Sequence, residues 1–414
     1  MTDDDRLLAE LNSATHDLDP PLAVIDLAAL DANRRDLANR AGTTPIRVAS
    51  KSLRCRWVLT EVLADPNYRG VLAFTLAEAL WLAEPDGDWS GIEDVVIGYP
   101  TVDRASLRRL ADSPLLRDRV TLMIDDVAHA EMLSQLASDA GAPLRVAIDV
   151  DSSWRPRPFG RGTALHVGAR RSPVHDRDQT VRLTRAIATD PNLQLTGLMF
   201  YEAQIAGVGD RPAGNPLRGR AIHLMQRASG AEIAQRRPQI VQAVNGELAR
   251  LGRPELEFVN AGGTGSLEMS SSDASVTEVT AGSGLFGPTL FDTYGHFQPA
   301  PAACFALPVV RRPAPGMVTV LGGGYVASGI ADPSRLPTPW LPTGLKLSSQ
   351  EGAGEVQTPL HGPAADALAV GDRVWFRHAK AGELAERFAD FQLVRGGERV
   401  GHTPTYRGEG KTFL

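Results

Sequence analysis

Residues 47–54 read RVASKSLR, a short apolar run that passes into a polar segment at Lys51. Lysine is scarce in this chain, so an amine at the end of an apolar run raises the question of what surrounds it. Residues 45–50 (PIRVAS) have the apolar character of a buried strand. The sequence therefore predicts that Lys51 directly follows the carboxyl end of a strand.

The same pattern recurs along the chain. Seven further apolar runs predict strands at 71–74, 94–99, 120–125, 144–150, 195–201, 256–262 and 276–282. Amphipathic segments between them predict helices at 75–84, 126–140, 177–190 and 218–252. Near-continuous apolar strands that alternate with helices are typical of a parallel α/β sheet. Eight strands over about 250 residues favour a closed (β/α)8 TIM barrel, with an open doubly wound sheet as the alternative.

The composition and the hydrophobic pattern of the sequence change after residue 295. Residues 299–329 are rich in proline and glycine, and short strand-like runs without a helical period continue to the end of the chain. This pattern predicts a mostly antiparallel β domain. The expected organisation is an N-terminal extension (1–21), a barrel (22–295) and a C-terminal β domain (296–414).

Composition narrows the class of protein. The 414 residues include 43 basic and 49 acidic side chains, a net charge of −6 that argues against a nucleic-acid partner. Cys55 and Cys304 are too few for a disulfide framework and favour a reducing compartment. No apolar stretch is long enough to span a membrane, and the acidic start MTDDDRLLAE lacks the apolar core of a signal peptide. We expect a cytoplasmic protein that handles small molecules.

The loops after the last two predicted strands are rich in glycine. They read NAGGTGSLE (260–268) and TAGSGLFGP (280–288), and barrels commonly bind phosphate in these two loops. Glycine lets backbone N–H groups approach an anion, and Thr264, Ser266 and Ser283 can add hydroxyl donors. An amine together with a phosphate site suggests pyridoxal 5'-phosphate (PLP) held on Lys51 as a Schiff base. Taken singly, a solvated lysine and ordinary turns would explain the same residues.

Several motifs together resemble a known family. Alongside RVASKSLR stand GLMFYEAQIAG (197–207), NAGGTGS (260–266), TEVTAGSGLF (277–286) and FRHAKAGELAERF (376–388). Their order and spacing resemble the fold-type III PLP enzymes of the alanine racemase N-terminal domain superfamily. The nearest branch is that of D-threonine aldolase and D-serine dehydratase, in its amino acid deaminase/aldolase subfamily. The resemblance implies a PLP-dependent lyase for β-hydroxy, D-configured amino acids, a D-serine dehydratase-like β domain and a homodimer.

The resemblance also implies roles for particular residues. Lys51 matches the lysine that binds PLP, and Tyr201 with its neighbour Gln204 matches a strand end that faces the cofactor. A packed aromatic at the barrel rim is the alternative for Tyr201. The phosphate loops match at Gly263, Thr264, Gly265, Gly282 and Ser283. Candidates for the basic group near cofactor and substrate, some of them ordinary surface residues, are Arg157, His166, Arg170 and Arg171.

One motif departs from the family pattern. Relatives hold a divalent metal beside PLP with a C-terminal His-x-Asp or His-x-Cys pair, whereas this chain has His378 followed by Lys380. A protonated amine cannot ligate a metal, so metal dependence is in doubt. Either Lys380 and His378 replace the metal near the substrate hydroxyl, or the pair is a structural remnant. An ordinary solvated lysine is the alternative for Lys380.

The expected mechanism is cleavage or dehydration at Cα of an amino acid bound to PLP. His378 is the predicted acid/base near the β-oxygen, and Lys51 is the base for the α proton. A racemase is the alternative enzyme, with Tyr325 or Tyr406 as the second base. Two readings of another class are a non-catalytic PLP-binding protein and a barrel that uses Lys51 on a sugar phosphate.

Overall fold

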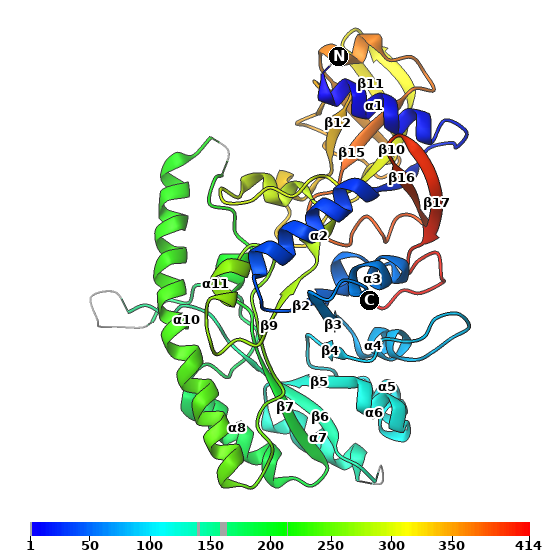
Figure 1. Cartoon of the computed structure of the whole chain (residues 1–414). Helices are drawn as coiled ribbons and strands as arrows, with labels where there is room; N and C mark the ends of the chain where they lie inside the picture. Colours follow the sequence, from blue (N-terminus) through cyan, green and yellow to red (C-terminus); the bar gives the residue numbers. More distant parts are fainter. Residues whose placement is uncertain (1, 139–140, 158–163, 213) are drawn as a thin grey trace. The chain divides into compact units, whose positions relative to one another are not determined.

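The computed structural model describes residues 2–138, 141–157, 164–212 and 214–414 (Figure 1). The chain divides into two compact units. Unit 1 comprises residues 1–36, 51–60 and 282–412, and unit 2 comprises residues 37–50, 61–281 and 413–414. Among the described residues, no helix is long and apolar enough to cross a membrane.

Unit 2 is built around a closed barrel of eight strands. Every neighbouring pair of these strands is parallel, from β2 round to β9 and back to β2. The strands are β2 (Ile46–Ala49), β3 (Tyr68–Ala73), β4 (Val95–Ile97), β5 (Val120–Ile124), β6 (Leu144–Val150), β7 (Leu193–Phe200), β8 (Phe258–Ala261) and β9 (Glu278–Ala281). The predicted (β/α)8 barrel and its eight strands are confirmed.

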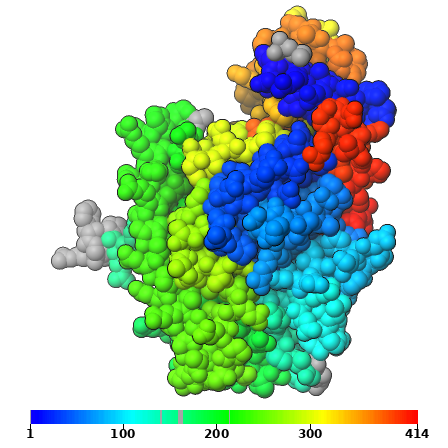
Figure 2. Space-filling model, in the orientation of Figure 1, coloured from blue at the N-terminus to red at the C-terminus, as the bar shows by residue number. Residues whose placement is uncertain are grey.

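Helices connect the barrel strands. They are α3 (Arg56–Leu63), α4 (Leu76–Ala83), α5 (Arg104–Asp112), α6 (Pro114–Arg119), α7 (Val127–Ala137), α8 (Arg177–Thr189), α9 (Ala203–Ala206), α10 (Pro216–Arg250) and α11 (Leu267–Ser271). The four helices predicted from sequence correspond to α4, α7, α8 and α10, although residues 139–140 lie outside the described part. The 35-residue α10, green in Figures 1 and 2, lies on the surface of unit 2.

The inside of the barrel is layered. A layer of apolar side chains, including Val96, Met123 and Met199, fills the middle of the barrel. Near the amino ends of the strands, the buried Arg47 of β2 bonds Glu278 of β9 at 2.6 Å and Asp94 at 2.8 Å. Because side chains alternate along a strand, the next inward positions after the apolar layer lie at the carboxyl ends, where barrel sites are built.

Unit 1 holds a nine-stranded, mostly antiparallel sheet. Its strands are β1 (Leu22–Asp26), β10 (Ala303–Ala314), β11 (Met317–Leu321), β12 (Thr338–Leu341), β13 (Lys346–Leu347), β14 (Gln357–His361), β15 (Arg373–Arg377), β16 (Asp390–Arg395) and β17 (Glu398–Pro404). The predicted antiparallel domain is therefore present. Short helical segments of this unit include α12 (Ser283–Phe286), η3 (Thr289–Thr293), η4 (Pro333–Arg335) and η5 (Pro363–Ala367).

The N-terminal residues differ from the expected organisation. Residues 22–26, expected to open the barrel, form β1, which pairs with β10 and β16 of the sheet. Helix α1 (Asp3–Ala14) packs on the same sheet, where Leu11 is buried and Asn12 accepts a bond from the Trp375 indole at 2.9 Å. Apolar character predicts a strand but not its partner, because pairing depends on distant segments. The chain then reaches β2 through α2 (Leu27–Ala41).

Candidate functional site

Lys51 follows β2 directly, in the short helical turn η1 (Ser50–Ser52). Ser50 is buried and its hydroxyl donates to the carbonyl of Leu72 on the neighbouring strand at 3.2 Å, which fixes the turn to the barrel. The side chain of Lys51 is half-buried. The predicted position of this lysine at a strand end is thus observed.

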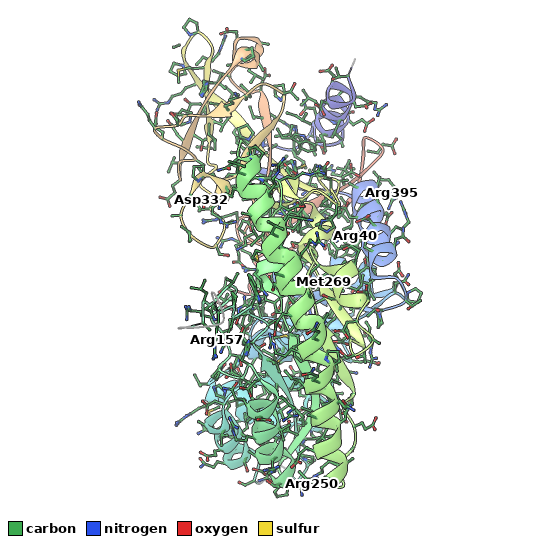
Figure 3. The ribbon with its side chains drawn as sticks, turned by 90° about the vertical axis from the view of Figure 1, so that its left-hand side faces the viewer. Arg40, Arg157, Arg250, Met269, Asp332 and Arg395 are labelled. Atoms are coloured by element: carbon green, nitrogen blue, oxygen red, sulfur yellow. The ribbon has the colours of Figure 1, made fainter. Side chains whose placement is uncertain are left out.

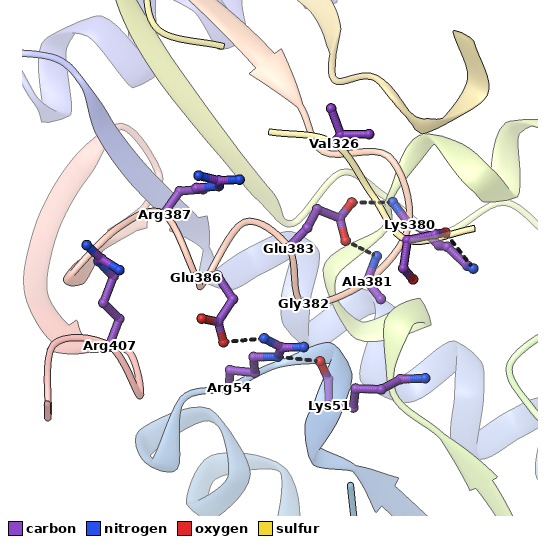
Figure 4. A pocket seen from close by; sticks show the side chains of 11 residues that line it. Lys51, Arg54, Val326, Lys380, Ala381, Gly382, Glu383, Glu386, Arg387 and Arg407 are labelled. Atoms are coloured by element: carbon purple, nitrogen blue, oxygen red, sulfur yellow. Dashed lines mark hydrogen bonds and ion pairs between the residues drawn. The ribbon is translucent and has the colours of Figure 1, made fainter. Parts of the chain in front are cut away.

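A cavity of about 480 Å³ borders Lys51 within unit 1 (Figure 4). Its wall includes Lys51 and Lys380, so the two lysines share one cavity. The residues that follow Lys380 in the wall are Ala381, Gly382, Glu383, Glu386 and Arg387. Glu383 accepts hydrogen bonds from the backbone N–H groups of Lys380 at 2.6 Å and Ala381 at 2.7 Å. The ammonium of Lys380 donates to the carbonyl of Ser328 at 3.1 Å. These bonds hold Lys380 at the cavity.

The backbone of Lys51 is held by its neighbours. Arg54 donates from Nε to the Lys51 carbonyl at 3.1 Å and forms an ion pair with Glu386. Arg54 has a φ of 49°, a conformation that side chains other than glycine rarely adopt. Gly382 packs so closely that an added Cβ would lie 2.1 Å from the Lys51 carbonyl oxygen. The loop that carries Lys380 therefore rests directly on the Lys51 backbone.

His378 has a different environment from Lys380. Its side chain is only 2% exposed, and its Nδ1 lies 3.3 Å from the carbonyl of Ala303. Its Nε2 has no hydrogen-bond partner among the described residues. Burial disfavours the imidazolium and lowers the pKa of His378 below its ordinary value. Within the described part of the chain, Lys380 lines the Lys51 cavity and His378 does not.

A buried carboxylate, that of Glu202, holds the loop after β8. Glu202 accepts the N–H of Gly262 at 2.9 Å and forms an ion pair with Arg237, and both side chains are at most 1% exposed. Gly262 has a φ of 80°, which favours glycine. A Cβ on Gly263 would lie 2.9 Å from the Ala206 side chain, so this position also requires glycine. Thr264, Gly265 and Ser266 of this loop are buried.

The second glycine loop follows β9 and belongs to unit 1. Gly282 is buried and Ser283, half-buried, begins α12. The amide of Asn33 donates to the carbonyls of Leu285 at 3.0 Å and Ala300 at 2.8 Å, which secures the turn. Both predicted phosphate loops therefore follow barrel strands that pair with each other.

Tyr201 lies at the end of β7, next to Arg171. The Arg171 guanidinium carbon lies 4.9 Å from the centre of the Tyr201 ring and 5.3 Å from that of Tyr99. Burial raises the pKa of Tyr201. Four basic residues were candidates for the group near the cofactor. Among the described contacts, Arg171 is the one of the four that stacks on a residue following a barrel strand, Tyr201. Arg157 (labelled in Figure 3) and Arg170 are exposed, and Nε2 of His166 lies 3.3 Å from the carbonyl of Ala169.

The predicted arginine-rich segment, 149–174, is described only in part, because residues 158–163 lie outside the described residues. Gln204 is buried and bonds residues that are distant from it in the sequence. Its amide donates to the Ser152 carbonyl at 2.8 Å and the Ser229 hydroxyl at 2.7 Å. Its Oε1 is buried without a partner among the described residues. Gln204 thus serves the packing of α9 and α10 and keeps one unused acceptor.

Sequence reasoning missed two aspartates at strand ends. Asp125 follows β5 and Asp149 lies in β6, and both are buried. Burial raises the pKa of Asp149 to about 7, with Asp125 and Asp151 raising it further and Arg171 opposing them. Asp125 lies 3.3 Å from His129 Nδ1. The sequence did carry a signal for them, because each of two consecutive apolar runs has an aspartate at its carboxyl end.

The residues fit the cofactor that the sequence suggested. PLP requires an amine for covalent attachment and backbone donors for its phosphate. Lys51 supplies the amine beside a cavity, and Gly263 packs so closely that an added Cβ would lie 2.9 Å from the Ala206 side chain. Among the described residues, no group of three or more His, Cys, Asp or Glu side chains is arranged to hold a metal ion.

Comparison with known proteins gives a family. A model described as the alanine racemase N-terminal domain matches residues 25–289. A 3-hydroxy-D-aspartate aldolase from Paracoccus denitrificans is 27% identical over 274 residues, which are 65% of this chain and 61% of that protein. A D-threonine aldolase from an Arthrobacter species is 25% identical over 314 residues, which are 74% of this chain and 72% of that protein.

Solved structures show the same fold over nearly the whole chain. The D-threonine aldolase from Filomicrobium marinum superposes with a TM-score of 0.75 and 23% identity, covering 95% of this chain and 96% of that one. The D-threo-3-hydroxyaspartate dehydratase from Delftia sp. HT23 gives a TM-score of 0.68 and 21% identity, covering 94% and 97%. Barrel and sheet therefore occur together in these proteins too.

Proposed function

Because the chain belongs to the alanine racemase N-terminal domain family, we propose that it is a PLP-dependent aldolase. Its substrates would be D-configured β-hydroxy amino acids, and it would cleave their Cα–Cβ bond. The observation that carries the proposal is Lys51, which follows a barrel strand and borders a cavity of about 480 Å³. The two relatives compared by sequence above are a 3-hydroxy-D-aspartate aldolase and a D-threonine aldolase, which supports this reaction.

Particular residues would hold the cofactor. Lys51 would bind its aldehyde carbon, and Gly263, Thr264 and Gly265 would receive its phosphate on one loop, as Gly282 and Ser283 would on the other. Two observations support this assignment. Gly263 is closely packed, and each of the two loops directly follows a barrel strand. Bound PLP would supply an electron sink for the cleaved bond.

The acid/base work would fall to the two lysines of the cavity. Lys51 would move the proton at Cα. For the β-hydroxyl we assign the proton transfer to Lys380, because it borders the cavity and His378 is buried away from its lining. Lys380 would have to be a neutral amine to take this proton as the Cα–Cβ bond breaks. The ammonium formed by the transfer would then supply, beside the new carbonyl oxygen, the positive charge that a metal gives elsewhere.

The first experiment tests the cofactor and the reaction together. The purified protein is loaded with PLP, its visible absorbance is recorded before and after borohydride, and the reduced adduct is mapped by mass spectrometry. We expect the adduct on Lys51 and release of an aldehyde from D-threonine. A keto acid would instead indicate a dehydratase, and interconversion of D- and L-alanine a racemase. Absence of any adduct after PLP loading would remove the cofactor from the proposal.

A second experiment addresses the metal. Activity is measured after dialysis against EDTA and again after zinc or manganese is added. We expect EDTA to leave turnover unchanged, because the position after His378 that relatives use for a ligand is occupied by Lys380. Loss of activity with EDTA and recovery with either metal would show that Lys380 has not replaced a metal.

A further inference from the structure

The charges that line the Lys51 cavity are unbalanced. Five cationic and two anionic side chains contribute to its wall (Figure 4). Of the two carboxylates, Glu386 forms an ion pair with Arg54, and Glu383 is engaged by two backbone N–H groups. Among the described residues, neither carboxylate forms an ion pair with Arg387 or Arg407.

Two of these cations make no ion pair within the described part of the chain. They are Arg387 and Arg407, and both are exposed to the solvent of the cavity. The guanidinium carbon of Arg387 lies 5.6 Å from the centre of the Tyr325 ring, a contact that orients the group and leaves its edges free for an anion. In Figure 4 the two arginines lie on one side of the cavity, and the amines of Lys51 and Lys380 on the other.

Cations on two sides of one cavity suit a substrate with an anionic group at each end. We propose that Arg387 and Arg407 form an anion subsite that selects β-hydroxy amino acids with a carboxylate side chain over those with a methyl side chain. The proposal rests on the proposed function, because it places the reacting Cα on the Lys51 side. A guanidinium group bonds a carboxylate through two parallel N–H donors, whereas a methyl group would leave both arginines to water. A cavity of about 480 Å³ has room for such a four-carbon substrate.

The test compares two substrates on one protein. The PLP-loaded full chain and its Arg387→Gln, Arg407→Gln and double variants are assayed with 3-hydroxy-D-aspartate and D-threonine. The measured quantity is the ratio of the two kcat/KM values. We expect the double variant to lower this ratio about 10- to 100-fold, since a hydrogen bond to a charged group contributes on that scale. Arg395→Gln removes an equal charge from an exposed arginine that pairs with Asp31, and should leave the ratio unchanged.

A binding measurement separates this proposal from the proposed function. Titration calorimetry with succinate, which cannot react, should show binding to the parent protein and to Arg395→Gln but not to the double variant. If no amino acid is turned over but succinate binding depends on the two arginines, the aldolase proposal fails and the subsite stands. If D-threonine is cleaved while the double variant changes neither the ratio nor succinate binding, the subsite is wrong and the aldolase proposal stands.

Discussion

Lys51 is held by contacts to its backbone, and the residue lines the cavity. The Arg54 bond and the close packing of Gly382 both act on its carbonyl oxygen. Lys51→Arg keeps the charge but removes the primary amine that can bind an aldehyde. We expect turnover to fall about 100- to 10,000-fold, on the scale of a lost acid/base group, and the borohydride adduct to disappear. Lys346→Arg, at an exposed position, is the control, and equal turnover in both variants would contradict the assignment.

The raised pKa of Asp149 predicts that the stability of the folded chain depends on pH. Its pKa is raised to about 7 from the ordinary 3.8, so between these values the folded chain binds a proton that the unfolded chain has lost. The free energy of unfolding therefore falls as pH rises through this range, and the loss is complete above it. We expect Asp149→Asn to be more stable than the parent at pH 8, by roughly 1 to 4 kcal/mol, with the difference narrowing towards pH 5.

Chemical denaturation at several pH values checks this prediction. Asp118→Asn, at an exposed position of α6, should change the unfolding free energy by less than about 0.5 kcal/mol at every pH. A constant difference for Asp149→Asn from pH 5 to pH 8 would mean that the pKa of this carboxyl is not raised in the folded chain.

At the scale of elements, the loop that carries Lys380 depends on one glycine. A Cβ at Gly382 would meet the Lys51 carbonyl at 2.1 Å and Arg54 Nε at 2.8 Å. We expect Gly382→Ala to cost about 1 to 3 kcal/mol of stability and to lower turnover, because Lys51 must move. Gly246→Ala, in the open interior of α10, should instead stabilise by about 0.5 to 1 kcal/mol. Thermal unfolding and turnover of both variants distinguish the two effects.

The loop after β8 depends on the ion pairs of α10. Arg237 pairs with Glu202 and, at 3.0 Å, with Asp273, and all three side chains are buried. Arg237→Ala would leave the Glu202 carboxylate buried and unpaired, and we expect a loss of about 3 to 5 kcal/mol. Arg250→Ala, at the exposed end of α10 in Figure 3, should cost less than about 1 kcal/mol. Similar losses in the two variants, measured by urea denaturation, would contradict a structural role for the buried pair.

At the scale of the whole molecule, we propose a homodimer, which the resemblance to fold-type III enzymes supports. Light scattering after size-exclusion chromatography should give twice the chain mass of 44.3 kDa. The measurement is made at the protein concentration used for the activity assay. A fully active species with the mass of a single chain would overturn this expectation.

Local sequence was enough to predict the elements of the barrel. The eight apolar runs, the long amphipathic segment that became α10 and the position of Lys51 after β2 all follow from periodicity over a few residues. The glycine pattern after β8 and β9 was equally visible, because a positive φ or a close contact leaves little choice of residue.

Tertiary structure alone decided the partners and surroundings of these elements. The pairing of β1 with β10, the burial of His378 and the shared cavity of Lys51 and Lys380 join segments far apart in the chain. The raised pKa of Asp149 likewise comes from burial and from neighbours on other strands. Sequence periodicity reports which face of an element is apolar, whereas pairing, burial and charge environment arise only when distant segments meet.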